Sequence, residues 1–212
     1  MGLTYKFISG FYDLIDIIYF TKRGNNPRKA LIDMIPNGSV RILDLCAGTA
    51  SNSIAIAKQR KNAEVVGVDI STDMLSAAAD KIQRNGIANV KLVNEDATAT
   101  SLEDGTFDFV ILALVLHEVD KTLAQKLLME AHRKLKPGGR LLVLEWEMPK
   151  KILQKLLFFP IQILEPKTFK IFINENKEEY FFENGFKLIE EQHCDYSCIY
   201  HMCKKEEKTI GL

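Results

Sequence analysis

The sequence lacks an excess of charge of either sign, and it has few cysteines. Its 212 residues contain 28 Lys and Arg against 28 Asp and Glu, so the formal net charge is zero. A protein that grips nucleic acid through the phosphate backbone normally presents a basic face, so we expect no nucleic-acid partner. The four cysteines, Cys46, Cys194, Cys198 and Cys203, show no secretory disulfide framework, which favours a reducing compartment.

Long hydrophobic runs are also missing. The longest uninterrupted run, Phe109 to Leu116, is far shorter than the roughly 18 residues that a membrane span requires. The N-terminal segment "MGLTYKFISGFYDLIDIIYF" is apolar, but it has no basic start and contains Asp13 and Asp16, so we expect no signal peptide. Together with the cysteine usage, these absences predict a cytoplasmic location.

What the sequence does contain is a regular alternation of apolar runs and helical patterns. Helices are predicted over residues 27–35, 51–60, 72–85 and 121–135. The apolar runs are "VRILDL", "AEVVGVD", "VKLVNED", "FDFVILA" and "RLLVLEW". Near-continuous apolar strands separated by helices of this length predict a parallel sheet with helices on both faces.

The pattern changes after Met148. We expect Pro160 to break the apolar stretch "KKILQKLLFFPIQIL" and residues 174–184 to form a helix. Two further strands, 186–194 and 196–204, are separated by almost nothing. So short a connection requires an antiparallel hairpin, and the sheet is therefore expected to end mixed.

The stretch "RILDLCAGTASNS" predicts a strand that enters a ligand-binding loop. A dinucleotide fingerprint needs glycines at the positions of Cys46, Gly48 and Ser51, and only Gly48 qualifies, which makes NAD a poor fit. A ligand without phosphate that carries an ammonium group would accept this loop with Asp44 nearby. Asp69 follows Gly48 by about 20 residues, the separation at which a carboxylate accepts the hydroxyls of a ribose.

Five motifs in register resemble the class I S-adenosylmethionine-dependent methyltransferases. The quoted segments, all between Tyr5 and Trp146, are "ILDLCAGTA", "VVGVDIS" with "DML", "NEDAT", "FDFVILALVLHEV" and "LKPGGRLLVLEW". The similarity is greatest to the branch of the ubiquinone and menaquinone biosynthesis enzymes. Members of that branch usually carry an Arg-Asn pair after the fourth strand, where this chain has His117 and Glu118.

The resemblance implies a Rossmann-like, doubly wound α/β sheet of seven strands, mostly parallel with an antiparallel C-terminal hairpin. It also implies a single domain with four parts. These are an N-terminal lid and helix (1–36), a cofactor-binding core (37–148), an acceptor-side insert (149–185) and the final hairpin (186–204). The implied activity is transfer of a methyl group from S-adenosyl-L-methionine to a small-molecule or lipid-like, quinone-like acceptor. A domain that binds this cofactor without catalysis, and a nicotinamide-dependent oxidoreductase, are the alternatives.

The resemblance also assigns roles to individual residues of the cofactor site. The residues around the methionine end are Asp44, Cys46, Ala47, Gly48, Leu112 and Ala113. Asp69 would hold the ribose hydroxyls, and the residues around the adenine are Ile70, Met74, Asp96 and Ala97. Tyr12 and Tyr5 would belong to a lid over the cofactor. Cys46 and Ala50 depart from the family pattern, because both positions are usually glycine.

A transferase of this kind aligns its acceptor and, where the acceptor carries a proton, needs a base. Three residues at the same rim are catalytic candidates: His117, Glu118 and Glu145. His117 is either a base or a residue that shapes the cofactor pocket or caps the next helix. Glu145 is more simply explained as a carboxylate that anchors a loop amide.

The cluster "HCDYSCIYHMC" contains metal-ligating residue types, but it spans two strands of a hairpin. We expect its Cys and His side chains to point to opposite faces, so we predict no metal site. The apolar segments 5–20 and 150–164 either form an acceptor pocket, make peripheral contact with a membrane, or pack on the edge of the sheet. The oligomeric state is left open.

Overall fold

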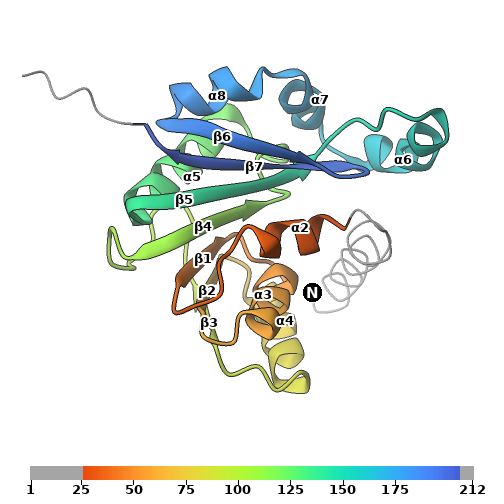
Figure 1. Cartoon of the computed structure of the whole chain (residues 1–212). Coiled ribbons are helices and arrows are strands. Elements are labelled where there is room, and N and C mark those ends of the chain that lie inside the picture. Colours follow the sequence, from red (N-terminus) through yellow and green to blue (C-terminus); the bar gives the residue numbers. More distant parts are fainter. Residues whose placement is uncertain (1–25, 206–212) are drawn as a thin grey trace, which may run out of the picture.

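One seven-stranded sheet organises the protein (Figure 1); the structure is a computed structural model that describes residues 26–205. The strands are β1 (Arg41–Leu45), β2 (Glu64–Asp69), β3 (Val90–Asn94), β4 (Phe107–Ala113), β5 (Leu135–Trp146), β6 (Phe186–His193) and β7 (Ser197–Lys204). Their spatial order is β3-β2-β1-β4-β5-β7-β6. β1 to β5 pair in parallel, whereas β7 is antiparallel to both β5 and β6. The predicted fold class is therefore confirmed.

Helices cover both faces of this sheet. They are α2 (Pro27–Asp33), α3 (Ser51–Gln59), α4 (Thr72–Arg84), α5 (Lys121–Lys134), α6 (Ile152–Leu164), α7 (Lys167–Asn174) and α8 (Lys177–Glu183). α2, α3 and α4 lie on one face, and α5 and α8 lie on the other (Figure 1). This is the arrangement that right-handed crossovers between parallel strands produce.

The strands alternate their side chains between two apolar cores. On β1, Ile42 packs in the core beneath α2 and α3, whereas Leu43 and Leu45 pack in the core beneath α5. All three residues are fully buried, which explains why this strand reads as a continuous apolar run. The order in which strands are added to the sheet reverses between β1 and β4, and a ligand crevice is expected there, at the carboxyl ends of the strands.

For the segment after Met148, the expectation for Pro160 is wrong, whereas the predicted helix before Gly185 is confirmed with a later start. Pro160 does not end a helix, because α6 runs through it. The carbonyl of Leu156 loses one amide partner, but Leu156 is exposed and water can replace that bond. The helix predicted over residues 174–184 is present as α8, which begins at Lys177 and ends at Glu183. α7 ends at Asn174, and α8 begins anew where the side chain of Asn176 accepts a hydrogen bond from the Glu179 amide.

Within residues 26–205, no helix combines the length and the hydropathy that crossing a bilayer would require. The predicted lid residues, Tyr5 and Tyr12, lie outside the described residues.

Candidate functional site

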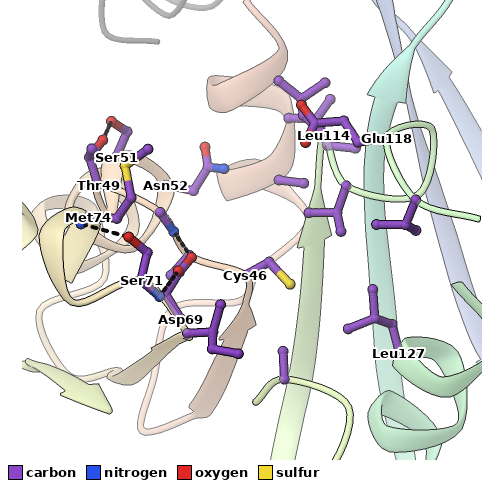
Figure 2. Close-up of a pocket in the computed structure, with 18 of the residues that line it drawn as sticks. Cys46, Thr49, Ser51, Asn52, Asp69, Ser71, Met74, Leu114, Glu118 and Leu127 are labelled. Carbon is purple, nitrogen blue, oxygen red and sulfur yellow. Dashed lines mark hydrogen bonds between the residues drawn. The ribbon is translucent and has the colours of Figure 1, made fainter. Parts of the chain in front are cut away.

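A cavity of about 650 Å³ opens at the carboxyl ends of β1, β2, β3 and β4. The predicted site residues that line it are Cys46, Ala47, Gly48, Asp69, Ile70, Met74, Asp96, Ala97, Ala113 and Glu118. In Figure 2, Asp69, Ser71 and Met74 stand on one wall, and Leu114 and Glu118 stand on the other, with Cys46 between them. The strand ends thus bring together residues that are far apart in the sequence.

The remaining predicted residues within the described part, Asp44, Leu112, His117 and Glu145, are buried and are not among those that line the cavity. Asp44 lies beneath the loop that follows β1, and the Ser53 hydroxyl donates a 2.6 Å hydrogen bond to its carboxylate. Burial, reinforced by the nearby Asp69 carboxylate, raises the pKa of Asp44 to about 6. Asp44 therefore supports the loop from below and adds negative charge to it.

The loop after β1 keeps the backbone of a glycine-rich loop with only one glycine. Cys46 (φ 59°) and Ala50 (φ 56°) occupy the left-handed region, as does Gly48 (φ 53°). Side chains with a Cβ pay a steric penalty there of about 1 kcal/mol or more. The two departures from the family pattern thus stand at left-handed backbone positions, which glycine adopts without this penalty.

Cys46 contributes a neutral thiol to the cavity. Burial raises the pKa of Cys46 to about 12, and the carboxylates of Asp69, Asp44, Asp96 and Glu118 act in the same direction. A thiolate is therefore disfavoured, and Cys46 is unsuited to nucleophilic chemistry.

Asp69 holds the loop and the next helix together. Its two carboxylate oxygens accept hydrogen bonds from the Gly48 amide (2.7 Å) and the Ser71 amide (2.9 Å). The hydroxyl of Ser71 caps α4 by accepting from the Met74 amide. Capping is thus done by Ser71, and each Asp69 oxygen keeps the capacity to accept a further hydrogen bond at the cavity.

The charges around the cavity are mainly negative. Asp96 is exposed at the rim, where hydrogen bonds from the amide and hydroxyl of Thr98 lower the pKa of its carboxyl. Asp69 and Glu118 add two further carboxylates. Among the described lining residues Arg28 is the single basic one, and its Nε donates to the Asn52 side chain (3.0 Å). The cavity therefore suits a ligand that is positively charged and also carries a carboxylate.

Behind the Glu118 wall lies a buried polar network centred on Glu145. One oxygen of Glu145 accepts from the amides of Val115 (3.0 Å) and Leu116 (2.7 Å) in the β4–α5 loop. Its other oxygen pairs with Nδ1 of His117. The Glu145 carboxylate thus anchors the loop that carries Glu118.

His117 lies between two carboxylates. Its Nε2 is 3.1 Å from the carboxylate of Glu165, which follows α6 and also accepts from the Trp146 indole (3.0 Å). Burial alone would lower the pKa of His117, but the carboxylates of Glu145 and Glu165 outweigh it and raise the pKa.

Several residues that line the cavity were not among those predicted from the sequence. Thr49, Ser51 and Asn52 belong to the polar end of the loop motif, and their position next to Gly48 was the available signal. Leu123 and Leu127 recur at helical spacing on α5, a pattern that a core helix shows equally well. Arg28 lies on α2, outside every recognisable motif.

The C-terminal hairpin differs from the expectation that His and Cys point to opposite faces. His193 pairs directly with Cys198, because a bulge between Leu188 and Glu190 shifts the register of β6 by one residue. Directly opposed residues share a face. With Glu147, whose carboxylate is 2.9 Å from Nδ1 of His193, they bring three potential ligand atoms within 4.8 Å of one another.

Comparisons with known proteins agree with this geometry. The family described as "Methyltransferase domain" matches residues 42–139. The demethylmenaquinone methyltransferase of Bacillus subtilis (strain 168) is 29% identical over 179 residues, 84% of this chain and 76% of that protein. The Staphylococcus saprophyticus enzyme of the same name is 35% identical over 179 residues, 82% of this chain and 73% of that protein. A solved structure of a SAM-dependent methyltransferase from Aquifex aeolicus has the same fold, with a TM-score of 0.72 at 18% identity, covering 95% of this chain and 97% of that chain.

Proposed function

Because this chain belongs to the class I S-adenosylmethionine-dependent methyltransferases, in the menaquinone and ubiquinone branch, we propose that it methylates a quinone-like small molecule. The observation that carries the acceptor class is the similarity to demethylmenaquinone methyltransferases, which extends over about three quarters of their length. The cofactor is S-adenosylmethionine. We treat the chain as one domain, with 37–148 as its cofactor-binding core and 149–185 on the acceptor side.

The cavity fits the cofactor in charge. S-adenosylmethionine supplies a methyl group on a positively charged sulfur and carries an ammonium and a carboxylate at its amino-acid end. In this proposal the carboxylates of Asp44 and Asp69 favour the cationic groups, and Arg28 receives the carboxylate. Asp69 also accepts the ribose hydroxyls, and Ile70, Met74 and Asp96 surround the adenine.

Methyl transfer is an in-line displacement, so the protein chiefly aligns the acceptor and excludes water. Among the three catalytic candidates, Glu118 lines the cavity and is placed to accept a proton from an acceptor. His117 and Glu145 are positioning residues in this proposal, because both are buried behind the cavity and hold the loop of Glu118.

α6 supports the further proposal that the protein meets a lipid surface. Ile152, Leu156, Phe159 and Ile163 recur at the spacing of one helical stripe, and each is more than half exposed. The opposite side of α6 is anchored by the buried Phe158 and Ile161. An exposed apolar stripe on a helix that begins after Lys150 and Lys151 suits contact with an anionic membrane, where a lipid-like acceptor would reside.

Two measurements test the proposed function. Calorimetric titration of the full chain with S-adenosylmethionine, S-adenosylhomocysteine and NAD should show micromolar binding of the first two and no response to NAD. Incubation with methyl-labelled cofactor and a demethylmenaquinone should transfer the label to the quinone. Cofactor binding without transfer to oxidised or reduced demethylmenaquinone would contradict the acceptor proposal, and NAD binding would contradict the assignment of the loop.

A further inference from the structure

A second set of ligand-type atoms lies where the cofactor cavity meets the Glu145 network. Nε2 of His117 and carboxylate oxygens of Glu118 and Glu165 all lie within 4.8 Å of one another. They come from the β4–α5 loop and from the residue that follows α6, so tertiary folding alone brings them together. One imidazole nitrogen and two carboxylates form a donor set that first-row divalent metals accept.

The orientation of His117 matches that of a metal ligand. Metal-binding histidines usually donate their second ring N–H to a carboxylate, which fixes the ring and its tautomer. Nδ1 of His117 pairs with Glu145 in this way, and Glu145 is itself held by the Val115 and Leu116 amides. Glu165 is likewise oriented, since its other oxygen accepts from the Trp146 indole.

His117 Nε2 provides an independent indication. His117 is 1% exposed, and within residues 26–205 no acceptor meets Nε2 in hydrogen-bonding geometry, although the Glu165 oxygen is 3.1 Å away. Buried polar atoms are normally satisfied. Here the unsatisfied atom faces a carboxylate at short range, as a lone pair directed at a shared cation would.

The charges around His117 also favour a bound cation. Three carboxylates, those of Glu118, Glu145 and Glu165, surround the single imidazole. Two of these, Glu145 and Glu165, have side chains that are 0% and 14% exposed. Burying carboxylates together is unfavourable unless a cation compensates them, and a divalent ion compensates more charge than one imidazolium proton.

We propose that His117, Glu118 and Glu165 bind a divalent first-row transition-metal ion at the acceptor side of the cofactor cavity. Ligand atoms at about 2.0–2.2 Å from one metal lie roughly 3–4 Å from each other, and Nε2 of His117 and the Glu165 oxygen are already 3.1 Å apart. Glu118 is exposed and lines the cavity, so it faces the acceptor side of the site. The ion would displace the proton on Nε2 to solvent, and three protein ligands would leave coordination positions open.

The location of the ion beside the cavity indicates a function in acceptor binding, and this function rests on the proposed methyl transfer. Glu118 lines the cavity, so an open position on its side would take an oxygen of the quinone-like acceptor. A metal-bound oxygen fixes the orientation of the acceptor ring relative to the cofactor and favours its deprotonated form. The ion would therefore act on the acceptor and leave cofactor binding unchanged.

Calorimetric titration of the full chain with Mn²⁺ and Zn²⁺, without cofactor or acceptor, tests the site directly. We expect one ion per chain, and electron paramagnetic resonance of bound Mn²⁺ should report nitrogen coordination. Glu118→Gln removes an exposed ligand and should weaken binding at least tenfold while the fold is kept, as circular dichroism would verify.

The matched control is Glu147→Gln, which alters the other ligand cluster, with His193 and Cys198. This variant should bind the ion like the parent. Absence of binding to the parent, unchanged binding in Glu118→Gln, or loss confined to Glu147→Gln would each overturn the proposal. Ion binding is measured without turnover, so a failure of the metal site would leave the acceptor assignment untouched. Only the methyl-transfer assay tests that assignment.

Discussion

The two walls of the cavity are built differently. The wall formed by the loops after β1 and β2 is held by short hydrogen bonds between backbone amides and one carboxylate, Asp69. The wall formed by the loop after β4 is held from behind by Glu145, and through His117 it is linked to Glu165 beyond α6. The first wall is self-contained within neighbouring segments, whereas the second depends on distant parts of the chain.

The difference reflects two tasks: the first wall binds the cofactor, and the second wall binds the acceptor in our proposal. All members of the family bind the same cofactor, so the first wall can be short, local and recognisable from motifs. The second wall must adapt to one acceptor, and its support from Glu165 comes from a segment that has no motif. Four substitutions or conditions test whether the two walls are as independent as their contacts indicate.

The largest expected effect comes from Glu145→Ala. Removing this buried carboxylate leaves two loop amides without an acceptor and His117 with only Glu165. We expect the free energy of unfolding to fall by about 3–5 kcal/mol, as for other broken buried ion pairs, measured by urea denaturation. Glu147→Ala, two residues along the chain and partly exposed, should cost less than about 1 kcal/mol. Equal losses would show that the network does not hold the second wall.

Asp44 should make the first wall sensitive to pH. Its folded-state pKa of about 6 lies above the ordinary value of 3.8, so between these values the folded state binds the proton more tightly. Its contribution to stability is therefore largest below pH 4 and is lost as the pH rises through 6, by about 3 kcal/mol at 1.36 kcal/mol for each pKa unit. Denaturation of the parent and Asp44→Asn at pH 4.5 and 7 would isolate this term. Parallel pH profiles of the two proteins would rule it out.

Asp69→Ala should act on the cofactor more than on the acceptor wall. Losing a charged hydrogen-bond acceptor costs roughly 1.5–3 kcal/mol, which corresponds to an affinity for S-adenosylmethionine about 10- to 150-fold weaker by calorimetry. Asp80→Ala, on the exposed side of α4, is the control and should bind like the parent. An unchanged affinity in Asp69→Ala would remove Asp69 from the cofactor site.

The smallest effect on stability is expected on α6. Leu156→Glu changes a residue that is 70% exposed, so the free energy of unfolding should shift by less than about 0.5 kcal/mol. The same change should reduce sedimentation with anionic phospholipid vesicles several-fold, because it places a negative charge in the apolar stripe. Glu178→Gln, far along the chain on α8, serves as a surface control. Undiminished sedimentation of Leu156→Glu would argue against contact of α6 with lipid.

The sequence allowed the first wall to be predicted far better than the second. Alternating runs and the Asp44, Gly48 and Asp69 spacing sufficed for the sheet and its loops, because these contacts are local. The contact between His117 and Glu165 is between residues 48 positions apart, and no sequence periodicity predicts it. The pairing of His193 with Cys198 depends on a bulge, which a strict two-residue alternation does not anticipate.

The position of β7 in the sheet has a consequence for the synthesis of the chain. The described residues that line the cavity all precede Met148, so a ribosome completes that surface well before it reaches the final hairpin. Until residues 197–204 emerge, one edge of β5 lacks its partner, and unpaired edges invite association between chains. The last strand to be made is thus inserted between β5 and β6, and a chain that stops short would carry a nearly complete cofactor surface beside an unpaired strand edge.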